Sequence, residues 1–148
     1  MKYFLTIGFV FAMILVSDIT KGQCDDQLIE ICYPEIGDFK FLKSYQVRFK
    51  KSKKDAPLMG KNVLVLTENT NYRIVVCNAS DYDGKLIFKL FQSSTSTMVG
   101  CTLDPSTNKI HNGFEFKCKS SGIYYLNYYF QDGREGCSVI MCAEKPTR

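Results

Sequence analysis

The side chains able to perform acid–base or nucleophilic chemistry are few and scattered in this sequence. His111 is the only histidine, and it lies in the turn-like stretch DPSTNKIHNG. A Ser–His–Asp or Cys–His arrangement would have to use this residue, because imidazole is the general base in both. A loop histidine exposed to solvent is the simpler interpretation. We therefore predict that the chain is not an enzyme and contains no catalytic residue.

Paired carboxylates occur in two turn-like segments. Asp81 and Asp83 lie in SDYDG, and Asp132 and Glu135 lie in QDGREG. Such pairs offer oxygen atoms to calcium, but no glutamate stands where a complete calcium-binding loop would close. Aspartate in a glycine-containing turn more simply caps the backbone. We predict no metal site and no cofactor.

Cysteine is the third reactive residue type, and seven are present. In an exported chain they predict disulfides, because the compartment beyond the membrane is oxidising. The odd count predicts three bridges with one unpaired cysteine, or one intermolecular bridge, and the connectivity stays open. Zinc is disfavoured because no C-x-x-C pair is present. The disulfide candidates are Cys24, Cys32, Cys77, Cys101, Cys118, Cys137 and Cys142.

A tyrosine-rich segment, IYYLNYYF at residues 123–130, is the best candidate for a binding surface. In a strand, alternate side chains point to opposite faces. One face then carries Tyr124, Leu126, Tyr128 and Phe130, which resemble core residues, and the other carries Ile123, Tyr125, Asn127 and Tyr129. If exposed, Tyr125, Asn127 and Tyr129 form a platform for sugar rings or a protein partner. Cross-strand packing explains the same residues equally well.

The elements that must position these residues begin after a targeting segment. Residues 1–22 have a short basic start, an apolar run and a polar exit with small residues, which is the layout of a secretory signal peptide. The run is too short for a stable membrane span, which needs about 20 residues. We expect a secreted or periplasmic protein. A net charge of +4 is too small to indicate a nucleic-acid partner.

The remainder divides into an acidic N-terminal segment, residues 23–38, and a β-sandwich domain, residues 39–148. Pro34 and Gly37 limit the first segment to one helical turn. The second shows about eight short strands separated by polar turns, which predicts an all-β, antiparallel, jelly-roll-like sandwich with disulfides. Residues 39, 41, 45, 47 and 49 are expected on one face of its first strand. The other expected strands span 62–66, 72–77, 85–91, 98–103, 114–118, 123–130 and 137–142.

Two further features have both a functional and a structural interpretation. Lysines 50, 51, 53 and 54 form the strongest charge asymmetry, which suits an anionic surface or, more simply, a solvated loop that keeps an edge strand soluble. Asn78-Ala79-Ser80 fits the N-glycosylation pattern. Whether Asn78 is glycosylated depends on the source of the chain.

The stretch from Tyr72 to Met141 resembles the bacterial pre-peptidase C-terminal type of β-sandwich. The likeness lies in YRIVV, in Gly84 before KLIFKLF, in FEFKC, and in Gly122 followed by a tyrosine-rich strand. The resemblance implies a non-catalytic accessory or binding module and carries over no functional residue. The chain is also similar to small exported bacterial proteins that consist of one such domain.

Together these features predict a secreted, non-catalytic binding or accessory module. Its ligand would be a glycan, cell-surface material or another extracellular protein. The alternative is a structural or protein-interaction protein linked through the unpaired cysteine. Ligand identity and oligomeric state stay open at this level.

Overall fold

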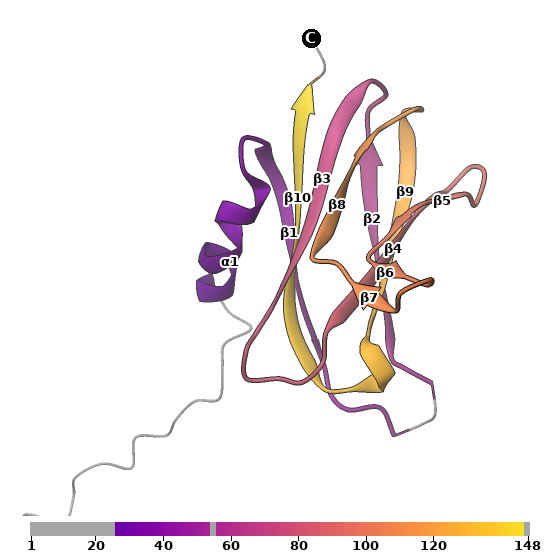
Figure 1. Ribbon diagram of the computed structural model, residues 1–148. Helices are drawn as coiled ribbons and strands as arrows, with labels where there is room; N and C mark the ends of the chain where they lie inside the picture. The colour runs from indigo at the N-terminus through magenta and orange to yellow at the C-terminus, as the bar shows by residue number, and fades with distance from the viewer. Residues whose placement is uncertain (1–25, 54–55, 147–148) are drawn as a thin grey trace, which may run out of the picture.

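The computed structural model describes residues 26–53 and 56–146, and these form two antiparallel four-stranded sheets packed face to face (Figure 1). The first sheet has the order β1-β10-β3-β8 and the second the order β2-β9-β4-β5. A two-stranded ribbon, β6-β7, follows β5. The predicted all-β antiparallel sandwich is confirmed. The predicted signal peptide, residues 1–22, lies outside the described residues.

The strands coincide closely with the predicted segments, except that the segment at 98–103 is divided and β7 was not expected. Among the described residues, no helix is long and apolar enough to cross a membrane. The strand bounds are β1 Lys40–Phe49, β2 Met59–Leu66, β3 Thr70–Asn78, β4 Leu86–Gln92, β5 Met98–Cys101, β6 Leu103–Asp104, β7 Lys109–Ile110, β8 Gly113–Lys117, β9 Gly122–Phe130 and β10 Gly136–Pro146.

The main core lies between the two sheets and follows strand alternation. In β9, Tyr124, Leu126 and Phe130 are at most 3% exposed, and Tyr128 packs against the same core. Gly60 faces Tyr128 across the β2–β9 pair, and a Cβ atom at Gly60 would lie 2.1 Å from the tyrosine ring. The predicted division of β9 into a core face and an outer face is therefore confirmed.

The first strand does not keep one face throughout, which corrects a prediction. Tyr45, Val47 and Phe49 pack into the core between the sheets, whereas Phe39 and Phe41 pack on the opposite side of the first sheet. The pairing of β1 with β10 shifts register between Phe41 and Lys43. A bulge inserts one residue and reverses the alternation, so the strict period of two fails there.

A second, smaller core lies on the outer side of the first sheet, beneath the N-terminal helices. Helix α1 spans Asp26–Cys32 and the 3-10 helix η1 spans Tyr33–Ile36, so the prediction of a single helical turn is wrong. Leu28, Cys32 and Ile36 are buried against Val139 and neighbouring residues. The burial of these apolar side chains stabilises a helix too short to form alone.

Two links fasten the helices to this sheet. Cys32 and Cys77 form a disulfide with a Cα–Cα distance of 5.6 Å. The Arg73 guanidinium lies over the Phe39 ring, 4.5 Å from its centroid, and donates a 2.9 Å hydrogen bond to the Ile36 carbonyl and another to the Glu115 carboxylate. The outer face of the first sheet is therefore largely covered.

The prediction of three bridges and one free cysteine is wrong, because Cys101, Cys118 and Cys142 are all free. Cys137 is also disulfide-bonded. Strand β3 lies between β10, which carries Cys142, and β8, which precedes Cys118. Cys142 and Cys118 are therefore separated by two strand spacings of about 4.8 Å each. Together these exceed the Cα separation of about 7 Å that a disulfide tolerates, so the two cysteines do not pair. Cys101 lies in the other sheet.

Leu126→Ala should lower the free energy of unfolding by about 2–5 kcal/mol, because it leaves a cavity between the sheets. The matched control is Ile123→Ala in the same strand, where the side chain is 48% exposed. We expect it to change stability by about 0.5 kcal/mol or less. Urea unfolding of both variants provides the measurement, and equal losses would contradict this sandwich register.

The free thiols should differ in reactivity. Burial raises the pKa of Cys142 to about 12, and both Cys142 and Cys118 are at most 2% exposed. An alkylating reagent at neutral pH should therefore modify Cys101 in the folded protein and the other two only after unfolding, since the thiolate is the reactive form. Peptide mass mapping gives the site of modification. Rapid labelling of Cys142 in the folded state would show that its burial is wrong.

Candidate functional site: the outer face of the second sheet

The outer face of the second sheet carries side chains from all four of its strands. The pairing registers place Met59 opposite Tyr129, Lys61 opposite Asn127, and Val63 opposite Tyr125. On the other side of β9, Lys89 and Phe91 of β4 lie opposite Asn127 and Tyr125, and Cys101 and Met98 of β5 lie opposite Lys89 and Phe91. We call this surface the outer face, and it consists of Met59, Lys61, Val63, Val65, Ile87, Lys89, Phe91, Met98, Cys101, Ile123, Tyr125, Asn127 and Tyr129, of which Ile87 is buried.

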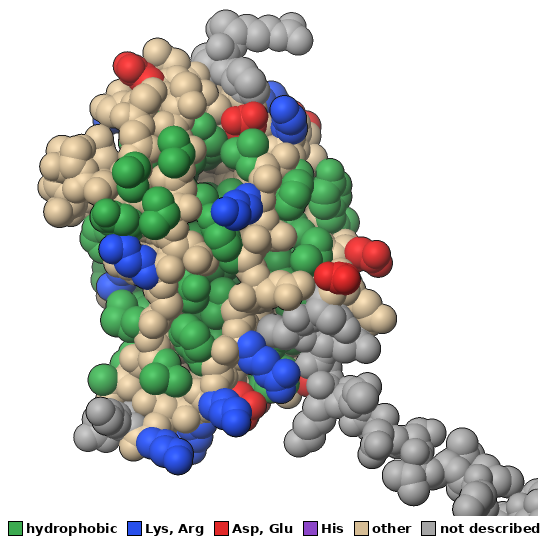
Figure 2. All heavy atoms as spheres, turned by 180° about the vertical axis from the view of Figure 1, so that it is seen from behind, with side chains coloured by type: hydrophobic (Ala, Val, Ile, Leu, Met, Phe, Trp, Pro, Cys, Tyr) green, Lys and Arg blue, Asp and Glu red, His purple; other side chains and the backbone are tan. Residues whose placement is uncertain are grey.

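The outer face is unusually apolar for a surface in contact with solvent. The exposed fractions are 66% for Met59, 51% for Val63, 78% for Val65, 53% for Met98 and 48% for Ile123. Figure 2 shows hydrophobic side chains spread across this side of the molecule with lysines between them. Single exposed hydrophobic residues are common in soluble proteins, but a contiguous group marks an interaction surface.

The covering of the two sheets differs. Helices α1 and η1 pack on the outer side of the first sheet, and Figure 1 shows α1 standing beside β1 and β10. None of the helices within the described residues packs on the second sheet. Several apolar residues of its outer face, among them Val63, Val65 and Met98, remain exposed in the described part of the chain.

The predicted binding residues Tyr125, Asn127 and Tyr129 all lie on the outer face, half-buried by their neighbours. Lys61 places its ammonium 3.5 Å from the centroid of the Tyr125 ring, and Lys89 lies 5.7 Å from that of Tyr129. A cation over an aromatic face is attracted by the ring quadrupole. The two tyrosines are thus held among lysine side chains as well as apolar ones.

The charge on this sheet has one sign. Its four strands contain Lys61 and Lys89 and no aspartate or glutamate. The residues of β2 on this face were not singled out from the sequence. The run NVLVL is apolar at nearly every position, and periodicity alone does not say which of its side chains are buried.

The other candidate residues lie apart from the outer face. His111 is exposed, and its backbone amide donates to the Thr102 carbonyl. Asp132 adopts a φ of 55° in the 3-10 turn η2, Gln131–Gly133, where its nearest charged contact is Arg134 at 3.7 Å. Hydrogen bonds from Ser106 and Thr107 lower the pKa of Asp104 to about 2. Of the carboxylates singled out from the sequence, Asp81, Asp83 and Glu135 border one hollow together with Lys51 and Arg134, whereas His111 and Asp132 are not among its lining residues.

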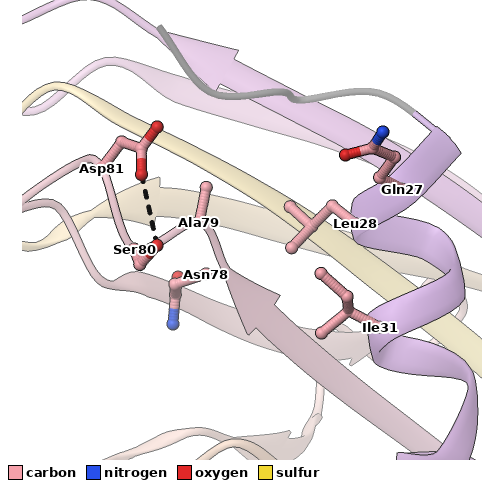
Figure 3. Close-up of a pocket in the computed structure, with 7 residues that line it drawn as sticks. All are labelled: Gln27, Leu28, Ile31, Asn78, Ala79, Ser80 and Asp81. Carbon is pink, nitrogen blue, oxygen red and sulfur yellow. Dashed lines mark hydrogen bonds between the residues drawn. The ribbon is translucent and has the colours of Figure 1, made fainter.

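Asn78 lies at the end of β3, beside a hollow of about 250 Å³ that is bordered by α1 and the turn after the strand (Figure 3). Its side-chain oxygen accepts hydrogen bonds from the Leu86 amide at 2.9 Å and the Ser138 hydroxyl at 2.7 Å. Asn78 therefore links β3, β4 and β10, which is a structural role independent of glycosylation. Asp81 is exposed in the same turn. Of the described residues, no three His, Cys, Asp or Glu side chains are grouped to hold a metal.

The valines of the outer face should contribute little to folding. The double variant Val63→Thr with Val65→Thr keeps β-branched side chains and removes two exposed apolar groups. We expect a change in the free energy of unfolding within about 0.5 kcal/mol for each substitution. Leu64→Thr, on the buried side of the same strand, is the control and should be clearly destabilising. A large loss in the double variant would mean that these valines are covered.

Comparison with known proteins finds a similar fold but no family to which the chain belongs. No family model matches the chain, and no curated protein matches it. A similar solved structure is PliG of Aeromonas hydrophila, a periplasmic lysozyme inhibitor of g-type lysozyme, with a TM-score of 0.52 and 11% sequence identity over 73% of this chain and 89% of that chain. The likeness supports a shared β-rich fold. The resemblance to the pre-peptidase C-terminal type of domain receives no support from these comparisons.

Proposed function

We propose that this chain is an exported, non-catalytic protein that binds another protein through the outer face of its second sheet. The observation that carries the proposal is the contiguous group of exposed hydrophobic side chains on that face, with Val65 at 78% exposed. Protein interfaces combine apolar and aromatic residues at their centre with polar groups at the rim. The outer face contains both kinds of group. A polar row of Lys61, Asn127 and Lys89 crosses it between the apolar and aromatic side chains, with Tyr129 on one side of the row and Tyr125 on the other.

A protein ligand fits this surface better than a glycan does. A sugar ring stacks on an open aromatic face, whereas Lys61 already lies 3.5 Å from the Tyr125 centroid and Lys89 near the Tyr129 ring. The exposed valines and methionines offer no hydrogen bonds to sugar hydroxyls. They would instead be buried by an apolar partner surface, from which burial gains about 25 cal/mol per Å².

The similar structure gives this proposal a precedent in kind. PliG of Aeromonas hydrophila is a periplasmic inhibitor of an enzyme, so a sandwich of this shape can serve a non-catalytic, protein-binding role outside the cytoplasm. The Cys32–Cys77 disulfide is also in keeping with an oxidising compartment. A g-type lysozyme is therefore the first protein to test as a partner.

Covalent linkage through a free cysteine is the second candidate function. Cys101 lies on the outer face with intermediate exposure, while the other free thiols of the described region are buried. An intermolecular bridge would therefore form at Cys101 and would bring the same apolar face into the contact. A non-reducing gel of the wild-type protein and of Cys101→Ser separates this mode from non-covalent binding.

The test replaces Val63 with the photo-reactive residue benzoyl-phenylalanine and irradiates the protein among the proteins secreted by its source, with g-type lysozyme assayed separately. We expect one defined covalent adduct from this position, because benzoyl-phenylalanine reacts only with what lies against it. The control carries the same group at Ser80, an exposed residue remote from the second sheet. Tyr125→Ala with Val65→Asp should abolish the Val63 adduct while the protein remains folded.

Equal labelling from Val63 and Ser80, or an adduct that persists in the Tyr125/Val65 variant, would contradict the proposal. A Val63 adduct with a second copy of the chain would replace a foreign partner with self-association. Inhibition of g-type lysozyme that is lost in the same variant would identify the partner class directly.

A further inference from the structure

A groove of about 400 Å³ lies at one open edge of the sandwich, between the hairpin that joins β4 to β5 and the segment that joins β8 to β9. Its apolar lining includes Met98, Val99, Phe116 and Tyr124. In Figure 1 the hairpin at β5 projects from the body of the sandwich. Binding pockets commonly measure about 300–1,000 Å³, so the groove has room for several ligand side chains.

The groove exists because the two sheets close unequally at their edges. On the side of β1 and β2, the Tyr45 hydroxyl donates a 3.2 Å hydrogen bond to the Val63 carbonyl, which ties the two edges together. On the side of β5 and β8, the Phe114 ring packs against Gly100. A Cβ atom on residue 100 would lie 2.5 Å from the Phe114 ring. Beyond that contact, toward Met98 and Phe116, the edges of the two sheets are not in contact, and the groove lies between them.

Strand β8 offers unpaired backbone along the groove. It pairs with β3 alone, and the Cys118 amide just beyond it donates to the Thr70 carbonyl at 2.9 Å. Backbone groups of successive residues alternate in direction across an antiparallel pair. The amides and carbonyls of Glu115 and Lys117 therefore point away from β3, where an added strand would meet them.

The charges at the groove favour an acidic ligand. Lys117 and Lys119 are the charged residues that line it within the described part of the chain. The nearby Glu115 carboxylate is bound by the Arg73 guanidinium through its Nε and a second, closer nitrogen, so its charge is compensated. Two lysines beside an apolar groove are complementary in charge and polarity to a segment that alternates carboxylate and apolar side chains.

We propose that this groove binds an extended acidic segment of another protein, which adds as a strand to the free edge of β8. The apolar side chains of this segment enter the groove beside Met98 and Phe116, and its carboxylates face Lys117 and Lys119. Main-chain hydrogen bonds supply affinity and the alternating side chains supply specificity, as in other strand-addition complexes. The groove borders the outer face at Met98, which belongs to both, but this proposal does not depend on the function proposed for that face.

A second copy of the chain is a poor occupant of the groove. Two β8 edges brought together would place Lys117 and Lys119 of one copy near the same residues of the other, and like charges repel. Lysine on an edge strand is a common device against such self-pairing. The charge pattern therefore selects for a foreign acidic segment.

The test titrates the ¹⁵N-labelled mature protein with a blocked peptide of alternating glutamate and valine, Glu-Val-Glu-Val-Glu-Val, at concentrations up to millimolar. We expect shifts at the amides of residues 113–119 and 97–99, and slower hydrogen exchange at Glu115 and Lys117. The lysine–valine counterpart should bind at least about tenfold more weakly, because its charge is reversed. N-methylation of alternate amides in the acidic peptide should also prevent binding, since it removes strand pairing.

The double variant Lys117→Glu with Lys119→Glu should lose the acidic peptide and gain the lysine peptide. Its control, Lys50→Glu with Lys51→Glu in the β1–β2 loop, changes the net charge equally and should leave binding unchanged. Absence of binding by the acidic peptide, equal binding of both peptides, or binding that survives N-methylation would overturn the proposal. Shifts confined to Tyr125 and its neighbours would assign the peptide to the outer face instead.

Discussion

Packing of alternate side chains between the two sheets is the constraint on which the rest of the molecule depends. Leu126 and Phe88 are completely buried in the centre of the second sheet, and Ile140 lies in the facing sheet. Because successive side chains of a strand point in opposite directions, filling this layer fixes what the other face of every strand presents. The position of each candidate binding residue follows from this packing.

The two sheets use their second faces differently. The first sheet buries its outer side beneath α1 and η1, where the Cys32–Cys77 disulfide and the Arg73 contacts to Ile36 and Phe39 hold the helices in place. The second sheet exposes valines, methionines and an isoleucine on its outer face, beside half-buried tyrosines. Exposure of this kind raises the risk of aggregation, and contiguous exposed apolar side chains are typical of interaction surfaces.

Charge connects the two surfaces proposed for binding. Lys61 and Lys89 lie among the apolar residues of the outer face, and Lys117 and Lys119 border the groove at β8. In both places lysine stands beside exposed apolar groups without a neighbouring uncompensated carboxylate. This arrangement suits partners with acidic rims and disfavours association between copies of the same chain. The two surfaces meet at Met98, and variants at Val65 and Tyr125 or at Lys117 and Lys119 test them separately.

The sequence by itself determined the all-β class, nearly every strand and the division of β9 into core and outer residues, because period-two alternation and turn residues are local signals. Tertiary structure decided the rest. The bulge after Phe41 reversed the face of β1, and the burial of Leu28 and Ile36 stabilised α1 and η1 where the sequence predicted a single helical turn. Which cysteines pair depends on distances between strands far apart in the chain. Which apolar faces stay uncovered depends on how the helices dock, and neither property is encoded in local pattern.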